Sequence, residues 1–152
     1  PVSAAALEEL NSGQMVVDAG LVEALADHVH ARAASDSSED LCAAMGCQLQ
    51  VDASLPVGHE GLLLQTGVIL VRPRRDVARM RLAMLHELSH WVFCEGRVVH
   101  THADVWALAL AIGAPRALVR RFELPGDLAA ATGLPWVIAH RRMAMVEALG
   151  TI

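Results

Sequence analysis

A short His-Glu-x-x-His motif in the middle of a long helical pattern most constrains how this chain can fold. The segment 75–94, RDVARMRLAMLHELSHWVFC, places Leu85, Leu88 and Val92 at a spacing that lines one face of a helix. Gly96 follows as a natural helix terminator. Such a helix is stable only when its apolar face is covered, so the rest of the chain must supply that cover.

The segments before this helix predict two helices and a small sheet. Helical spacing covers 20–34, and a shorter helix is expected at about 40–45, ended by Gly46. Runs with strand character follow at 47–51, 61–65 and 68–72. Thr66-Gly67 lies between the last two runs and predicts a tight hairpin.

The segments after the motif predict helices only. Residues 103–112 are apolar on nearly all sides, and Gly113 and Pro115 follow them. Shorter helices are expected at about 115–122, 126–132 and 135–149. The order of helices, small antiparallel three-stranded sheet and further helices predicts an α+β fold. We expect one domain over 1–152, with N-terminal helices at 1–45, a sheet and metal-site core at 46–114, and a helical tail at 115–152.

Composition narrows the classes of function. The chain has 152 residues, is 54% hydrophobic and carries a net charge of −5, so it can bury a core but is a poor candidate for binding nucleic acid through phosphate neutralisation. Its three cysteines, Cys42, Cys47 and Cys94, are expected to be buried in a reducing compartment. No apolar run reaches membrane-spanning length, and PVSAAALEEL at 1–10 does not resemble a signal peptide. We therefore expect a cytoplasmic protein that does not enter membranes, of unknown oligomeric state.

The motif itself comprises His86, Glu87 and His90. Side chains four residues apart lie one helical turn apart, so both imidazoles can bind one zinc ion. Glu87 is angularly offset from them and is suited to accept a proton from water as a general base. Histidines and a glutamate on a largely buried helix are costly to bury unless a cation or other partner satisfies them. The alternative is a pair of core histidines with ordinary hydrogen bonds.

A catalytic zinc site needs a third protein ligand and an open position. Asp104 is favoured, because it is a lone carboxylate at the start of the apolar helix 103–112, although it could simply cap that helix. His102 and then His100 are the competing ligands. Since the chain has no tyrosine, His100, His102 or His140, or backbone N–H groups, would have to help the metal stabilise the oxyanion. Cys94 could also bind the metal as a thiolate, but inert packing is the commoner role of such a cysteine.

The stretch from Gly46 to Pro115 resembles the ImmA/IrrE family of metallopeptidases. The resembling segments are Gly46-Cys47-Gln48-Leu49, Gly61 with Val68-Ile69-Leu70-Val71, Leu85-His86-Glu87-Leu88-Ser89-His90-Trp91, and Asp104 through Pro115. Asp104 stands where the family has glutamate, and Trp106 where it has asparagine. The resemblance implies a zincin-like minimal metallopeptidase fold, in which a small three-stranded sheet packs on the HExxH helix.

The resemblance also implies a zinc-dependent peptidase whose protein substrate is a helix–turn–helix transcriptional repressor, in stress or mobile-element regulation. One alternative is a weakly active or inactive zinc-binding module that docks a repressor or toxin partner without cleaving it. A second is a DNA-binding regulator that uses the tail at 126–149, with His140, Arg141 and Arg142 on a recognition helix. The negative net charge makes this second alternative the weaker one.

Overall fold

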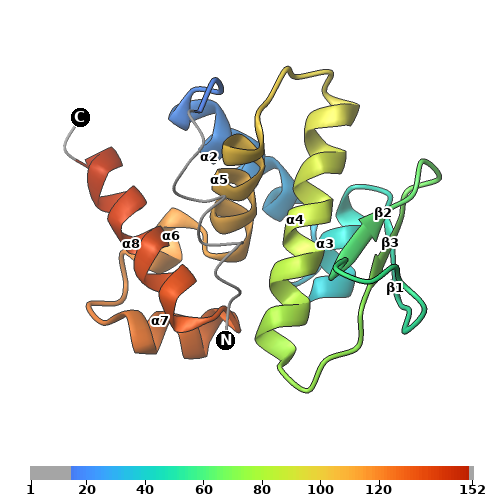
Figure 1. Cartoon of the computed structure of the whole chain (residues 1–152). Helices are drawn as coiled ribbons and strands as arrows, with labels where there is room; N and C mark the ends of the chain where they lie inside the picture. The colour runs from blue at the N-terminus through green and yellow to red at the C-terminus, as the bar shows by residue number, and fades with distance from the viewer. Residues whose placement is uncertain (1–14, 151–152) are drawn as a thin grey trace.

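The structure is a computed structural model that describes residues 15–150 (Figure 1). The helices are α2 (Ala19–Arg32), α3 (Ser38–Ala44), α4 (Val77–Glu95), α5 (His102–Gly113), α6 (Arg116–Val119), α7 (Pro125–Thr132) and α8 (Trp136–Gly150). The strands are β1 (Gln48–Val51), β2 (Gly61–Leu63) and β3 (Val68–Val71). These elements confirm the α+β class. Within the described part of the chain, no helix is both long and apolar enough to cross a membrane. The stretch 1–10, where the sequence predicts no signal peptide, lies outside the described residues.

The sheet is mixed, with the order β1-β3-β2, so the prediction of an antiparallel sheet is wrong for one of its two pairings. β2 and β3 are antiparallel and turn through Gly67 at a φ of 86°, which confirms the predicted hairpin. β1 is parallel to β3, with Gln48 opposite Val68. The physical reason is the loop 52–60, which is long enough to carry the chain past the position of β3 before β2 begins.

Helix α4 lies between the sheet and α5, as Figure 1 shows, and contacts β2, β3 and α5. Its first turn is capped by Asp76, whose carboxylate accepts a hydrogen bond from the N–H of Arg79 at 3.2 Å. Leu85, Leu88 and Val92, which define the predicted apolar face, are all buried. Burial of this face fixes the rotation of α4, and therefore the direction in which the histidines of the motif point.

Helix α5 is the centre of the helical half of the molecule. Every residue from Ala103 to Gly113 is buried, because α2, α4 and α8 all pack around this helix. Close packing is required at Gly113, where an added Cβ would lie 2.7 Å from a Leu85 methyl group. The hydrophobic residues buried around α5 form one cluster that extends from Val17 to Val146.

A buried ion pair joins α8 to α2. Arg142 on α8 is fully buried and donates two hydrogen bonds to the carboxylate of Glu23 on α2, at 2.6 and 2.9 Å. Its Nε donates a third, at 2.8 Å, to the carbonyl of Ala114 just after α5. These bonds satisfy both charged groups in a site that excludes water.

We expect the Arg142→Ala variant to lose about 3–5 kcal/mol of unfolding free energy, because the carboxylate of Glu23 is then buried without its partner. Urea denaturation followed by circular dichroism measures the loss. Arg141→Ala is the matched control, since Arg141 is an exposed neighbour on the same helix, and it should change stability by less than about 0.5 kcal/mol. A change below about 1 kcal/mol in Arg142→Ala would contradict a structural role for the pair.

Candidate metal centre

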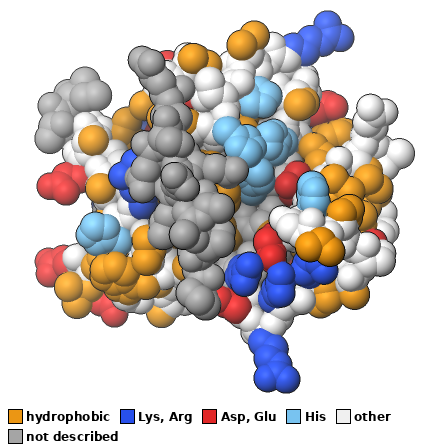
Figure 2. Space-filling model, viewed as in Figure 1, with side chains coloured by type: hydrophobic (Ala, Val, Ile, Leu, Met, Phe, Trp, Pro, Cys, Tyr) orange, Lys and Arg blue, Asp and Glu red, His pale blue; other side chains and the backbone are white. Residues whose placement is uncertain are grey.

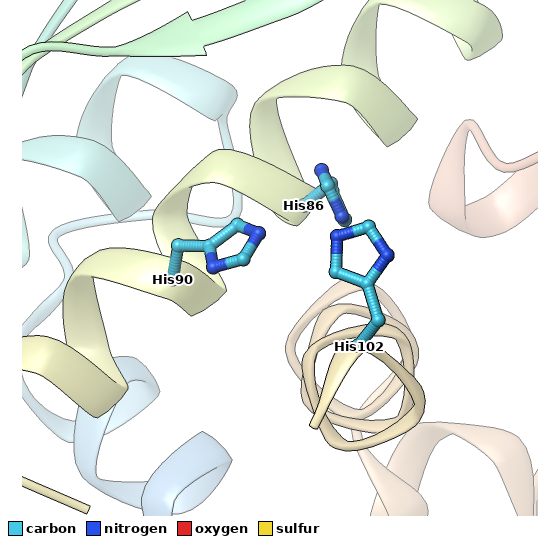
Figure 3. A group of neighbouring side chains, drawn as sticks. All are labelled: His86, His90 and His102. Carbon is cyan, nitrogen blue, oxygen red and sulfur yellow. The ribbon is translucent and has the colours of Figure 1, made fainter. Parts of the chain in front are cut away.

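Three histidines from two helices converge on one point. His86 and His90 project from α4, and His102 projects from the first residue of α5, with the three rings turned toward a common space (Figure 3). One ring nitrogen of each lies within 4.8 Å of the others. Three imidazoles bound to zinc at about 2.1 Å in tetrahedral positions have their nitrogens about 3.4 Å apart, so the three rings would have to move closer together to bind an ion.

The environment of His86 favours a cation. Its Nε2 is buried and has no hydrogen-bond partner among the described residues, while its Nδ1 lies 3.3 Å from Oε1 of Glu87. A buried ring nitrogen without a partner is costly, and coordination to a metal would satisfy it. Trp106, one turn along α5 from His102, stacks on the His86 ring with the centroids 4.5 Å apart. This stacking holds the ring in the orientation that faces the other two histidines.

His90 is held in its neutral form. Burial, followed by the proximity of His86, lowers the pKa of His90 from its ordinary value of 6.5 to about 4. A neutral imidazole is the form that binds a divalent metal. The donor set of three imidazoles therefore fits zinc, which accepts nitrogen ligands in tetrahedral sites with one position left for water or substrate.

Glu87 lies beside this group and against the sheet. Its side chain is 14% exposed, and its position next to Gly61 of β2 is so close that an added Cβ there would lie 3.0 Å from Cγ of Glu87. The carboxylate is not part of the convergent donor group. It is thus available to exchange a proton beside the histidines, as the motif predicts.

Asp104, the favoured third ligand, has other partners in the structure. Asp104 is fully buried, and its carboxylate accepts hydrogen bonds from the N–H groups of Thr101, Val16 and Val17, at 2.8 to 3.3 Å, and from the hydroxyl of Thr101. Thr101 in turn accepts from the N–H of Asp104, which completes a capping box at the start of α5. The carboxylate of Asp104 is therefore engaged by these N–H groups and is not part of the convergent group, whose third member is His102, the first competing ligand.

The other predicted site residues lie apart from the donor group. His100 stacks on Phe93 and donates through Nδ1 to the carbonyl of Val98 at 2.8 Å, with its ring centroid 5.9 Å from that of His90. His140 is exposed on α8 and stacks on Trp136. His100 is thus a neighbour of the centre, whereas His140 contacts none of the three donors.

The cysteines do not join the site. Burial raises the pKa of the Cys42 thiol to about 12 and that of Cys47 to about 11, so both are expected to be inert. Cys94 is exposed, which corrects the expectation that all three are buried. It is the last but one residue of α4, where the helix extends beyond the core.

His30 lies outside the metal centre. Its Nε2 is 2.7 Å from the carbonyl of Ile112, which joins α2 to the end of α5, and its Nδ1 is 3.3 Å from the carboxylate of Asp36.

Sequence comparison adds no relative to this picture. Searches against models of protein families and against curated proteins both give no match for this chain.

Proposed function

We propose that this protein is a zinc-dependent peptidase whose metal is held by His86, His90 and His102. The observation that carries the proposal is the convergence of three imidazole nitrogens beside Glu87, with the buried Nε2 of His86 lacking a partner among the described residues. The zincin-like arrangement implied by the resemblance to ImmA/IrrE metallopeptidases is consistent with α4 packed against an edge strand that is antiparallel to its neighbour. Zinc bound there would supply a Lewis acid that polarises the peptide carbonyl and acidifies water.

The remaining chemistry falls to the protein's own residues. Glu87 accepts a proton from the attacking water as the water oxygen bonds to the peptide carbonyl carbon. It then returns the proton to the amide nitrogen, so that the C–N bond breaks and a carboxylic acid and an amine leave. His100, whose ring centroid is 5.9 Å from that of His90, is the candidate for stabilising the oxyanion. Because its Nδ1–H donates to the Val98 carbonyl, only the doubly protonated ring has an Nε2–H to donate to the oxyanion.

The outer edge of β2 is the proposed binding surface for the substrate backbone. In the β2–β3 register Leu62 is opposite Leu70, and Leu64 N–H donates to the Val68 carbonyl, so the hydrogen-bonding groups of Gly61 and Leu63 point to the outer edge. A peptide that adds as a strand to this edge passes Glu87, because Gly61 packs against that side chain. Sequence-tolerant backbone pairing of this kind suits a protein substrate.

On the basis of the same resemblance, we propose that the substrate is a helix–turn–helix repressor and that the protein cleaves it in the cytoplasm. The alternative of DNA binding by the tail is weakened by one observation. Arg142, which that alternative places on a recognition helix, is fully buried in its ion pair with Glu23 and cannot reach a phosphate or a base.

Metal removal tests the proposal. The purified protein should carry about one zinc per chain, cleave unfolded protein or a peptide mixture, lose the cleavage when a chelator removes the metal, and regain it on addition of zinc. Mass spectrometry of the products checks for new peptide ends. Metal-dependent cleavage by the native protein supports the peptidase, whereas a zinc-loaded protein that cleaves nothing supports the alternative of a docking module.

A further inference from the structure

A group of arginines lies at the end of the proposed substrate edge. The segment after β3 contains Arg72, Arg74, Arg75, Arg79 and Arg81, in a chain whose net charge is −5. The structure separates these residues by their contacts. Arg81 donates to the hydroxyl of Ser38 on α3. Arg74 and Arg79 bond to Glu60, and Arg72 is close enough to help lower the pKa of its carboxyl. Arg75 follows Arg74 in the chain and is exposed, and on the face drawn in Figure 2 basic side chains lie below the pale-blue histidines.

The positive charge of this group exceeds the negative charge available to it. Arg74 and Arg79 share the carboxylate of Glu60, with Nε of Arg74 at 3.0 Å and Nη2 of Arg79 at 3.0 Å, and hydrogen bonding from Arg74 lowers the pKa of that carboxyl. The guanidinium of Arg72 donates hydrogen bonds to three neutral carbonyls in the loop 52–60, those of Leu55, Pro56 and His59. Its charge is therefore not cancelled by these contacts.

Arg75 is the most available member of the group. It is exposed and has neither a hydrogen-bond nor an ion-pair partner among residues 15–150. The following residue, Asp76, is used as the cap of α4 through the N–H of Arg79. Four arginines thus face three carboxylates, those of Asp52, Glu60 and Asp76, and an excess of one positive charge is left on an accessible surface.

The position of this arginine cluster, Arg72, Arg74, Arg75 and Arg79, is fixed relative to the metal centre. Glu60 directly precedes Gly61, which packs on Glu87 and lies near the carbonyl of Ala83. Arg79, Ala83 and Glu87 are spaced by four residues and so form one stripe along α4. The cluster and the candidate general base therefore lie at successive points of one surface, made by β2 and this stripe.

We propose that the arginine cluster selects peptides that carry an aspartate or glutamate on one side of the cleaved bond. The inference rests on the proposed peptidase function and names its substrate class. A peptide paired with the outer edge of β2 passes Glu87 at Gly61, and its next residues reach the arginines. A carboxylate there forms a charge-assisted contact with Arg75, whereas a lysine meets like charge.

The test uses the full-length zinc-loaded protein and a mixture of unstructured peptides in which one flanking position at a time holds Asp, Glu, Gln or Lys. We expect cleavage with Asp or Glu at one position to exceed that with Gln by about three- to tenfold in kcat/KM, with Lys slowest. The preference should shrink at 0.5 M salt, because exposed charge pairs are screened.

Variants of Arg75 identify the residue responsible. Arg75→Gln should abolish the preference, and Arg75→Glu should reverse it toward Lys; each is measured as the ratio of kcat/KM values for the Asp, Gln and Lys peptides. Arg121→Glu is the matched control, since it makes the same charge change at an exposed arginine of the helical tail and should keep the preference. Cleavage without a charge preference, or a preference that survives Arg75→Glu, overturns the inference alone. Absence of any cleavage by the native protein overturns the peptidase function and the inference together.

Discussion

Replacement of Glu87 by glutamine is expected to lower kcat for peptide hydrolysis by about 10²- to 10⁴-fold, the range that a general base contributes. Glutamine has the shape of glutamate but cannot accept the proton of water at neutral pH. The side chain is 14% exposed and packs against Gly61, so the isosteric change should leave the fold intact. Initial rates on a cleavable peptide, with mass spectrometry of the products, measure the loss.

Two comparisons separate catalysis from structure in this variant. Zinc content should stay the same, because the carboxylate of Glu87 is outside the convergent donor group. Glu95→Gln, the same substitution at the exposed end of the same helix, should retain full activity. A kcat within about twofold of native in Glu87→Gln would assign proton transfer to another group, and the proposed mechanism would then be wrong.

Local sequence signals predicted the elements of this fold well. The predicted helix 75–94 corresponds to α4, because its apolar spacing, its cap and Gly96 are all encoded within one segment. The hairpin at Thr66-Gly67 was equally local, since Gly67 tolerates the positive φ that the turn needs. The relation between His86 and His90 follows from helical geometry alone.

Contacts between segments that are far apart in the sequence were harder to predict. The parallel pairing of β1 with β3 was missed. Three short strand segments do not reveal whether the loop 52–60 connects two neighbouring strands or passes over the position that β3 fills. The ion pair of Glu23 and Arg142 joins residues 119 positions apart, which no local pattern can indicate.

Prediction of the third ligand also depended on contacts between distant segments, although one local signal was present. Thr101-His102-Ala103-Asp104 has the spacing of a capping box, which assigns Asp104 to the backbone. Two of the N–H groups bound by Asp104, those of Val16 and Val17, are more than 80 residues away in sequence. The sequence does not reveal that the first turn of α5 packs close to α4. This packing brings His102 next to His86 and His90.

Paired substitutions at His102 and Asp104 should give opposite results. His102→Ala removes one of three donors, and we expect zinc affinity to fall by about 100-fold or more, since even residues that only support a ligand are worth about 10- to 100-fold. Asp104→Asn leaves the donors in place but weakens a buried acceptor of several hydrogen bonds. It should lower the unfolding free energy by about 1–3 kcal/mol and change zinc affinity by only a few fold. Competition with a chromophoric chelator measures the affinity, and urea denaturation measures the stability.

His140→Ala is the matched control for His102→Ala, because it deletes an exposed imidazole that contacts none of the donors, and it should bind zinc as the native protein does. His100→Ala is informative in a different way. If His100 acts on the substrate and not on the metal, this variant should keep its zinc and lose activity. Loss of zinc in Asp104→Asn with retention in His102→Ala would show that the carboxylate binds the metal. The start of α5 would then have to rearrange on metal binding, because in the present structure its capping box occupies that carboxylate.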